Sequence, residues 1–117
     1  MKNYTDLEQA QKLAEFLPIE SADMWYDNNG ESIAGRPEVR CCSFVGLASI
    51  NIPCWSLAAL LDVLPEGVFE SYYVPNIQKE GGRYSIAYGD EKLLYIADNP
   101  VDACVKMILK LHEQNIL

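Results

Sequence analysis

The chain has 117 residues, 50% of them hydrophobic and 22% charged, which is the balance of a folded protein with room for a single domain over residues 1–117. Its 17 acidic and 9 basic residues give a formal net charge of −8, which argues against direct nucleic-acid binding because that affinity comes mainly from Lys and Arg. No signal-like segment or membrane-length apolar run is present, so we expect a soluble, cytoplasmic protein without membrane contact.

The first predicted element is a helix over residues 6–17. Thr5 and Glu8 have the spacing of a capping box, in which the two side chains accept hydrogen bonds from backbone N–H groups at a helix start. Apolar residues then recur at helical spacing up to Leu17, and Pro18 ends the pattern. We therefore expect Thr5 to cap this helix.

A weak β region is predicted next. Residues 24–26 have the bulky side chains of a strand, residues 27–30 have turn chemistry, and residues 32–34 form a weak return strand. Periodicity does not decide the structure of residues 35–51. Three residues there would share one face of a strand: Val39, Cys41 and Phe44.

A short helix is predicted to follow Ser56. The run SLAALLDVL places leucines on one face, Ser56 is a favourable N-cap, and Pro65 ends the run. Trp55 would pack on Leu60 as a hydrophobic staple. Because this helix is short, its stability must come from packing.

Three antiparallel strands in a meander are predicted over residues 68–74, 83–88 and 92–97, with glycine-containing turns between them. Alternation gives the middle strand one face of large side chains and one of small ones, Tyr84, Ile86 and Tyr88 against Ser85 and Ala87. The smaller residues suit the face on which a helix packs, although the aromatic face is also too apolar to be left wholly exposed to water.

The closing helix is predicted to begin at Asn99–Pro100. Asn99 is a good N-cap, Pro100 suits the first helical position, and Asp102 places negative charge near the positive end of the helix dipole. Five residues form its apolar stripe: Val101, Cys104, Val105, Ile108 and Leu111. The predicted fold class is α+β, in the order helix, weak β region, helix, three strands, helix.

The sequence shows no catalytic constellation, metal-ligand spacing or cofactor motif. His112 is interpreted as a solvated residue near a helix end. Cys104 belongs to an apolar stripe. Cys54 is the candidate reactive thiol, because a position near a helix N-terminus lowers a thiol pKa, although core packing is the favoured explanation.

Aromatic side chains provide a second candidate site, since aromatics dominate binding energetics. Core filling is the competing explanation for most of them. The residues proposed for an interaction surface are Trp25, Tyr72, Tyr84 and Tyr88.

Two stretches carry a resemblance to a known family: residues 52–65, IPCWSLAALLDVLP, and residues 97–104, ADNPVDAC. They look like signatures of an uncharacterised family found in phage-like and other mobile-element regions of gut bacteria, and residues 4–9 and 21–24 are similar as well. The resemblance implies no catalytic residue.

The last third of the chain is also similar, mainly in topology, to HicB-type antitoxins. In these proteins a three-stranded antiparallel sheet leads into a helix with a pattern similar to residues 99–103. The likeness implies an antitoxin-like or inhibitor role.

The leading hypothesis is a non-catalytic interaction or regulatory module encoded by a phage or mobile element, with a basic protein as partner. One alternative is a small enzyme or ligand-binding protein with a pocket near Cys54 and Trp55. Another is a phage structural subunit. A homodimer formed through a sheet edge is a further expectation.

Overall fold

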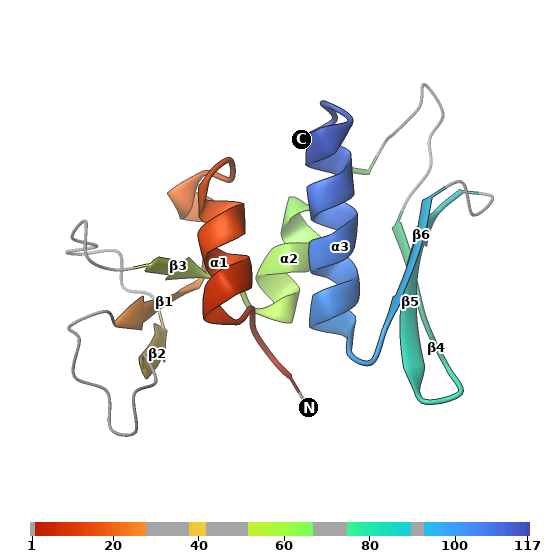
Figure 1. Ribbon diagram of the computed structural model, residues 1–117, viewed down its shortest axis with the longest axis horizontal. Coiled ribbons are helices and arrows are strands. Elements are labelled where there is room, and N and C mark those ends of the chain that lie inside the picture. Colours follow the sequence, from red (N-terminus) through yellow and green to blue (C-terminus); the bar gives the residue numbers. More distant parts are fainter. Residues whose placement is uncertain (1, 28–37, 42–51, 67–74, 90–92) are drawn as a thin grey trace.

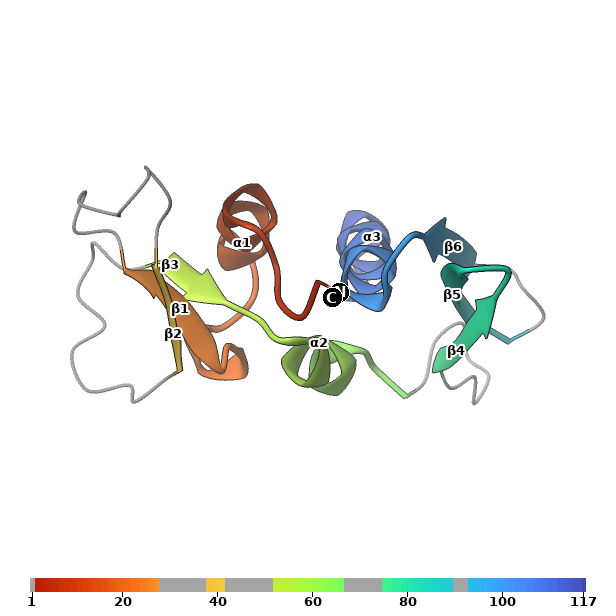
Figure 2. The same cartoon turned by 90° about the horizontal axis from the view of Figure 1, so that it is seen from below.

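The structure is a computed structural model that describes residues 2–27, 38–41, 52–66, 75–89 and 93–117. These residues form three α-helices, one short 3₁₀ helix and two three-stranded antiparallel sheets, which confirms the α+β class. The helices lie between the two sheets, which occupy opposite ends of the 46 Å long axis (Figures 1 and 2). Within the described ranges, no helix has the length and apolar character needed to cross a membrane.

Helix α1 spans Leu7–Ala14, and its N-cap is Asp6 rather than Thr5. The Asp6 carboxylate accepts from the Gln9 N–H at 2.8 Å, and the Gln9 side chain accepts from the Asp6 N–H at 3.0 Å. The predicted capping box is therefore wrong by one residue. Thr5 is unavailable for capping because its backbone N–H donates to the Trp55 carbonyl at 3.0 Å and its hydroxyl accepts from the Trp55 N–H at 3.2 Å.

The N-terminal sheet consists of β1 (Met24–Asp27), β2 (Glu38–Cys41) and β3 (Ile52–Cys54), in the order β2-β1-β3. Strand β1 agrees with the prediction. The predicted return strand at 32–34, most of the predicted turn and Phe44 lie outside the described residues, and the pairing partner observed on that side is β2.

The sequence did not predict β3, which contains Pro53 and pairs with β1. Proline cannot donate to a ladder and is tolerated at the edge of a sheet, where β3 lies. The 3₁₀ helix η1 (Ile19–Ser21) joins α1 to β1.

Helix α2 spans Leu57–Val63 and begins as predicted, with the Ser56 hydroxyl accepting from the Ala59 N–H at 3.2 Å. Trp55 and Leu60, the predicted staple pair, are both fully buried in the main core. The Trp55 indole N–H donates to the Ser21 hydroxyl at 2.9 Å. The short helix therefore rests on core packing, as its length required.

The C-terminal sheet consists of β4 (Pro75–Glu80), β5 (Arg83–Tyr88) and β6 (Leu93–Ala97), in the order β4-β5-β6. The last two strands agree with the prediction. The first strand that the structure describes begins at Pro75, and the strand predicted over residues 68–74 lies outside the described residues. The position of β4 follows from the turn. Gly81 and Gly82 have φ of 60° and 78°, which suits a two-residue hairpin whose strands must flank it directly.

Helix α3 spans Pro100–Glu113, and Asn99 caps it by accepting from the Asp102 N–H at 2.8 Å. The predicted start is confirmed. The face of the sheet that α3 covers was predicted wrongly: Ile86 and Tyr88 are fully buried, and the smaller residues point away. Packing the larger apolar side chains against the helix removes more apolar surface from water.

The main core is continuous from α1 through α2 and α3 to the C-terminal sheet, and Figure 2 shows the three helices between the two sheets. A smaller cluster of Ala10, Tyr26 and Cys54 joins α1 to the N-terminal sheet. A polar bridge also connects the N-terminal segment, α1 and α3. Asp102 accepts from the Lys2 ammonium at 2.7 Å and from the Gln9 amide at 2.8 Å.

Candidate interaction surface

The C-terminal sheet has a face that α3 does not cover, and we call it the outer face. By strand alternation and register its members are Asn76, Gln78, Glu80, Arg83, Ser85, Ala87, Leu94 and Ile96. Leu94 is 40% exposed and Ile96 is 47% exposed, the highest value among the large hydrophobic side chains that the structure describes. The two side chains stand beside small residues of the middle strand, which leaves them accessible.

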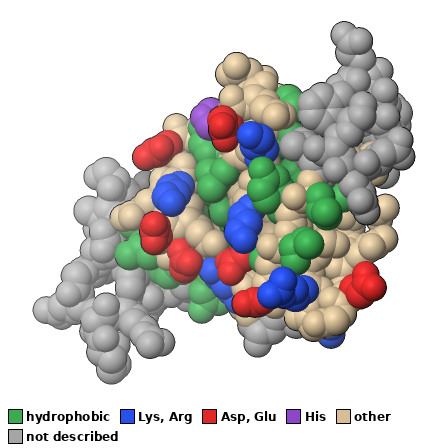
Figure 3. Space-filling view, turned by 45° about the vertical axis from the view of Figure 1, so that its right-hand side comes forward, with side chains coloured by type: hydrophobic (Ala, Val, Ile, Leu, Met, Phe, Trp, Pro, Cys, Tyr) green, Lys and Arg blue, Asp and Glu red, His purple; other side chains and the backbone are tan. Residues whose placement is uncertain are grey.

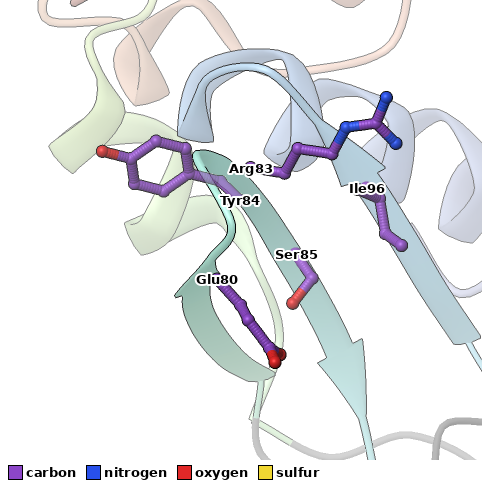
Figure 4. Close-up of a pocket in the computed structure, with 5 residues that line it drawn as sticks. All are labelled: Glu80, Arg83, Tyr84, Ser85 and Ile96. Carbon is purple, nitrogen blue, oxygen red and sulfur yellow. The ribbon is translucent and has the colours of Figure 1, made fainter.

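Ile96 stands between two hollows. One, of about 180 Å³, is lined by Glu80, Arg83, Tyr84, Ser85 and Ile96, and Figure 4 shows Glu80 and Ser85 on the same side of the sheet, with the Tyr84 ring turned away. The other, of about 260 Å³, adds Asp98, Asp102 and Lys106 around the start of α3. The apolar centre is therefore surrounded by charges of both signs.

This side of the molecule carries interspersed hydrophobic, basic and acidic side chains (Figure 3). Lys106 helps to hold β6 in place, because its ammonium group donates to the Ile96 carbonyl at 3.3 Å. That contact ties β6 to α3 at the edge of the sheet. An apolar centre with a polar, charged rim is the usual arrangement of a protein interface.

Of the four aromatic residues proposed for an interaction surface, Tyr88 lies in the core. Tyr88 is fully buried, its hydroxyl donates to the Pro65 carbonyl at 2.8 Å, and burial raises the pKa of its phenol. Tyr84 lies on the inner face, with the Lys79 ammonium 5.6 Å from its ring centre. Trp25 is half-buried in the other sheet and Tyr72 lies outside the described residues. Core filling, the competing explanation, is therefore the correct one for Tyr88.

Cys54 has an environment opposite to that of an activated thiol. Its side chain is fully buried, its sulfur lies 3.4 Å from the Thr5 hydroxyl, and burial raises the thiol pKa. Burial likewise raises the pKa of Cys104 to about 11. Proximity to the start of α2 does not offset the loss of water around Cys54. Both thiols therefore act as small core side chains.

His112 is at the end of α3, as predicted, but it is not simply solvated. Its ring stacks on Phe16 with the two ring centres 3.8 Å apart, and its Nδ1 lies 2.9 Å from the Leu117 carbonyl oxygen. These contacts join the ends of α1 and α3. In the described part of the chain, no group of three or more His, Cys, Asp or Glu residues could hold a metal ion.

The acidic excess is unevenly distributed. Residues 1–74 contain eleven acidic and four basic residues, whereas residues 75–117 contain six and five. Part of this excess borders an open hollow of about 470 Å³ between η1 and α2, where Glu20, Asp23 and Asp62 surround alanine side chains. Asp23 also accepts from the Ser56 N–H at 2.9 Å, so it has a structural role there.

Sequence reasoning did not single out Leu94 and Ile96. The signal was present, since alternation in β6 places them on the same face as Ser85 and Ala87. They were missed because that face was expected to be covered. Comparison of the chain with protein-family models, curated proteins and solved structures finds no match.

Proposed function

We propose that the protein is a non-catalytic interaction module that binds a protein partner through the outer face of its C-terminal sheet. The supporting observation is the exposure of Leu94 and Ile96 beside small neighbours and within a rim of both charge signs. Burying such side chains against a partner releases water from apolar surface, while the rim sets orientation. A regulatory role in a phage or mobile element is part of this proposal.

The proposed partner is a basic protein. The rim around Ile96 is nearly balanced in charge, so the rim by itself favours neither a basic nor an acidic partner. The acidic excess of residues 1–74 acts at longer range and attracts a positively charged molecule during the encounter. Charge therefore sets the association rate, and the apolar centre sets the lifetime of the complex.

The test compares affinity capture from lysate of the native host by the wild type, by Leu94→Lys/Ile96→Lys, and by Ile19→Lys. Ile19 is a matched control because it is 40% exposed and lies in η1, away from the outer face. We expect one specific basic protein to be retained by the wild type and by Ile19→Lys and lost by the double variant. Equal retention by all three would refute the proposed surface.

A second measurement separates the two roles of charge and apolar contact. With the purified partner, raising the salt concentration should slow association, because screening weakens attraction at a distance. The double variant should instead speed dissociation. An association rate that does not depend on salt would contradict the basic partner while leaving the surface itself unaffected.

The alternative functions have less support. The enzyme hypothesis rested on a pocket near Cys54 and Trp55, and both side chains are fully buried. A phage structural subunit stays a hypothesis that no contact among the described residues favours over the interaction module.

A further inference from the structure

The two edges of the C-terminal sheet differ in how they are occupied. At the edge formed by β6, the Ile96 carbonyl accepts from the Lys106 ammonium, and α3 packs against the strand. At the edge formed by β4, the described residues provide a pairing partner on one side only, namely β5. Residues 76–80 are all exposed, including Ile77 at 37%. An uncovered edge strand is a template for pairing with another chain.

The hairpin defines which backbone groups of β4 face outward. Glu80 and Arg83 flank the two-residue turn and form a hydrogen-bonded pair, after which hydrogen-bonded and non-hydrogen-bonded pairs alternate. Ile77 and Lys79 occupy the non-hydrogen-bonded positions opposite Ile86 and Tyr84. Their N–H and C=O groups therefore point to the outer edge, where they are available to a second strand.

We propose that β4 pairs antiparallel with β4 of a second copy of this chain, with the two Ile77 residues opposite each other on the two-fold axis. The two C-terminal sheets then form one six-stranded sheet. In this register the exposed apolar side chains meet, Gln78 lies opposite Asn76 of the second copy, and Lys79 lies opposite Pro75. No like charges face each other directly, whereas a register centred on Lys79 would oppose two ammonium groups.

The charge distribution favours a second copy at this end of the molecule. Two chains of net charge −8 repel, but the excess is carried by residues 1–74, whereas residues 75–117 have six acidic and five basic residues. The N-terminal sheet and β4 lie at opposite ends of the long axis (Figures 1 and 2). Pairing through β4 therefore joins the two chains through the segment of each that is nearly neutral.

The test measures the mass of the purified full chain by sedimentation equilibrium, from about 1 µM to about 1 mM. We expect a reversible transition from the 13.1 kDa monomer to a species of twice that mass. Ile77→Pro removes an outward N–H, and it should raise the dissociation constant by about tenfold or more. Ile77→Lys, which places two ammonium groups on the two-fold axis, should have the same effect without a change in the backbone.

Gln78→Pro is the matched control for backbone geometry. Its N–H faces Ser85 within the chain, so this variant should lower the melting temperature, whereas Ile77→Pro should do so much less. An introduced thiol reports the register: Ile77→Cys should form a disulfide between copies that mass spectrometry identifies. The double variant at Leu94 and Ile96 should still dimerise, which separates this proposal from the proposed function.

A monomer at every concentration would overturn the proposal, as would a dimer that neither Ile77→Pro nor Ile77→Lys weakens. A disulfide that forms between copies of Gln78→Cys and not between copies of Ile77→Cys would overturn the register.

Discussion

The two ends of the molecule are stabilised in different ways. At the C-terminal end, successive strands form hairpins and α3 covers them with an apolar stripe that belongs to the main core. At the N-terminal end, β1 pairs with β3, so that Met24 lies opposite Cys54, far along the chain, and the local cluster is small. The C-terminal sheet therefore combines pairing between neighbouring strands with a large apolar core, whereas the N-terminal sheet pairs distant segments and needs additional stabilising contacts.

That support is a hydrogen-bonded cluster around the buried Thr5. Its carbonyl accepts from the Tyr26 hydroxyl at 2.6 Å, and its hydroxyl accepts from the Trp55 N–H at 3.2 Å. Burial raises the pKa of the Tyr26 phenol, so it stays protonated and able to donate. Because buried polar groups are costly when unpaired, this cluster specifies one arrangement of the N-terminal segment.

The largest expected effect is on the main core. Leu60→Ala should lower the free energy of unfolding by about 2–5 kcal/mol, because it removes buried methyl groups and leaves a cavity. Leu61→Ala is the matched control on the same helix: Leu61 is 39% exposed and Leu60 is fully buried. The control should change stability by less than about 0.5 kcal/mol. Equal losses in urea unfolding would contradict the placement of α2.

An intermediate effect is expected at the N-terminal end. Thr5→Val keeps the shape of the side chain but leaves the Trp55 N–H without its hydroxyl acceptor, which should cost about 1–3 kcal/mol. Thr5→Ser keeps the hydroxyl and should cost less. Urea unfolding followed by tryptophan fluorescence measures both. A larger loss in the serine variant would show that packing, and not hydrogen bonding, supports this end.

The smallest effect concerns the polar bridge that connects the N-terminal segment, α1 and α3. Burial opposes ionisation of Asp102, but hydrogen bonds from Lys2, Gln9 and Asn99 and the Lys2 charge outweigh it and lower the carboxyl pKa below 3.8. Its contribution to stability is present above pH 3.8 and is lost as the pH falls through the lowered pKa.

The contribution of Lys2 to stability depends on pH in the opposite direction. Burial opposes its charge, but hydrogen bonds with Asp102 and Asp6 raise its pKa above 10.5, so its contribution is present below that pH and is lost at higher pH. Lys2→Met and Asp102→Asn should each cost about 1 kcal/mol at neutral pH, since the pair is partly exposed. A double-mutant cycle that shows no coupling between Lys2 and Asp102 would contradict the bridge. The Asp102→Asn variant should also lose less stability than the wild type when the pH is lowered.

Two corrections show where local reasoning was insufficient. Thr5 and Asp6 are both good caps, and the choice of Asp6 depends on the pairing of Thr5 with Trp55. Alternation along β5 separates its two faces but does not say which one α3 will cover. The interaction surface was missed for this second reason, because Leu94 and Ile96 belong to the face that was expected to be buried.

The sequence by itself determined three local features: the start of α3 at Asn99–Pro100, the cap of α2 at Ser56 and the turn at Gly81–Gly82. Each of them depends only on residues that are close together in the chain. The tertiary structure alone decided that Pro53 belongs to a strand and that the aromatic face of β5 packs inward. These features depend on contacts between distant segments, where the gain from burying apolar surface selects among locally equivalent arrangements.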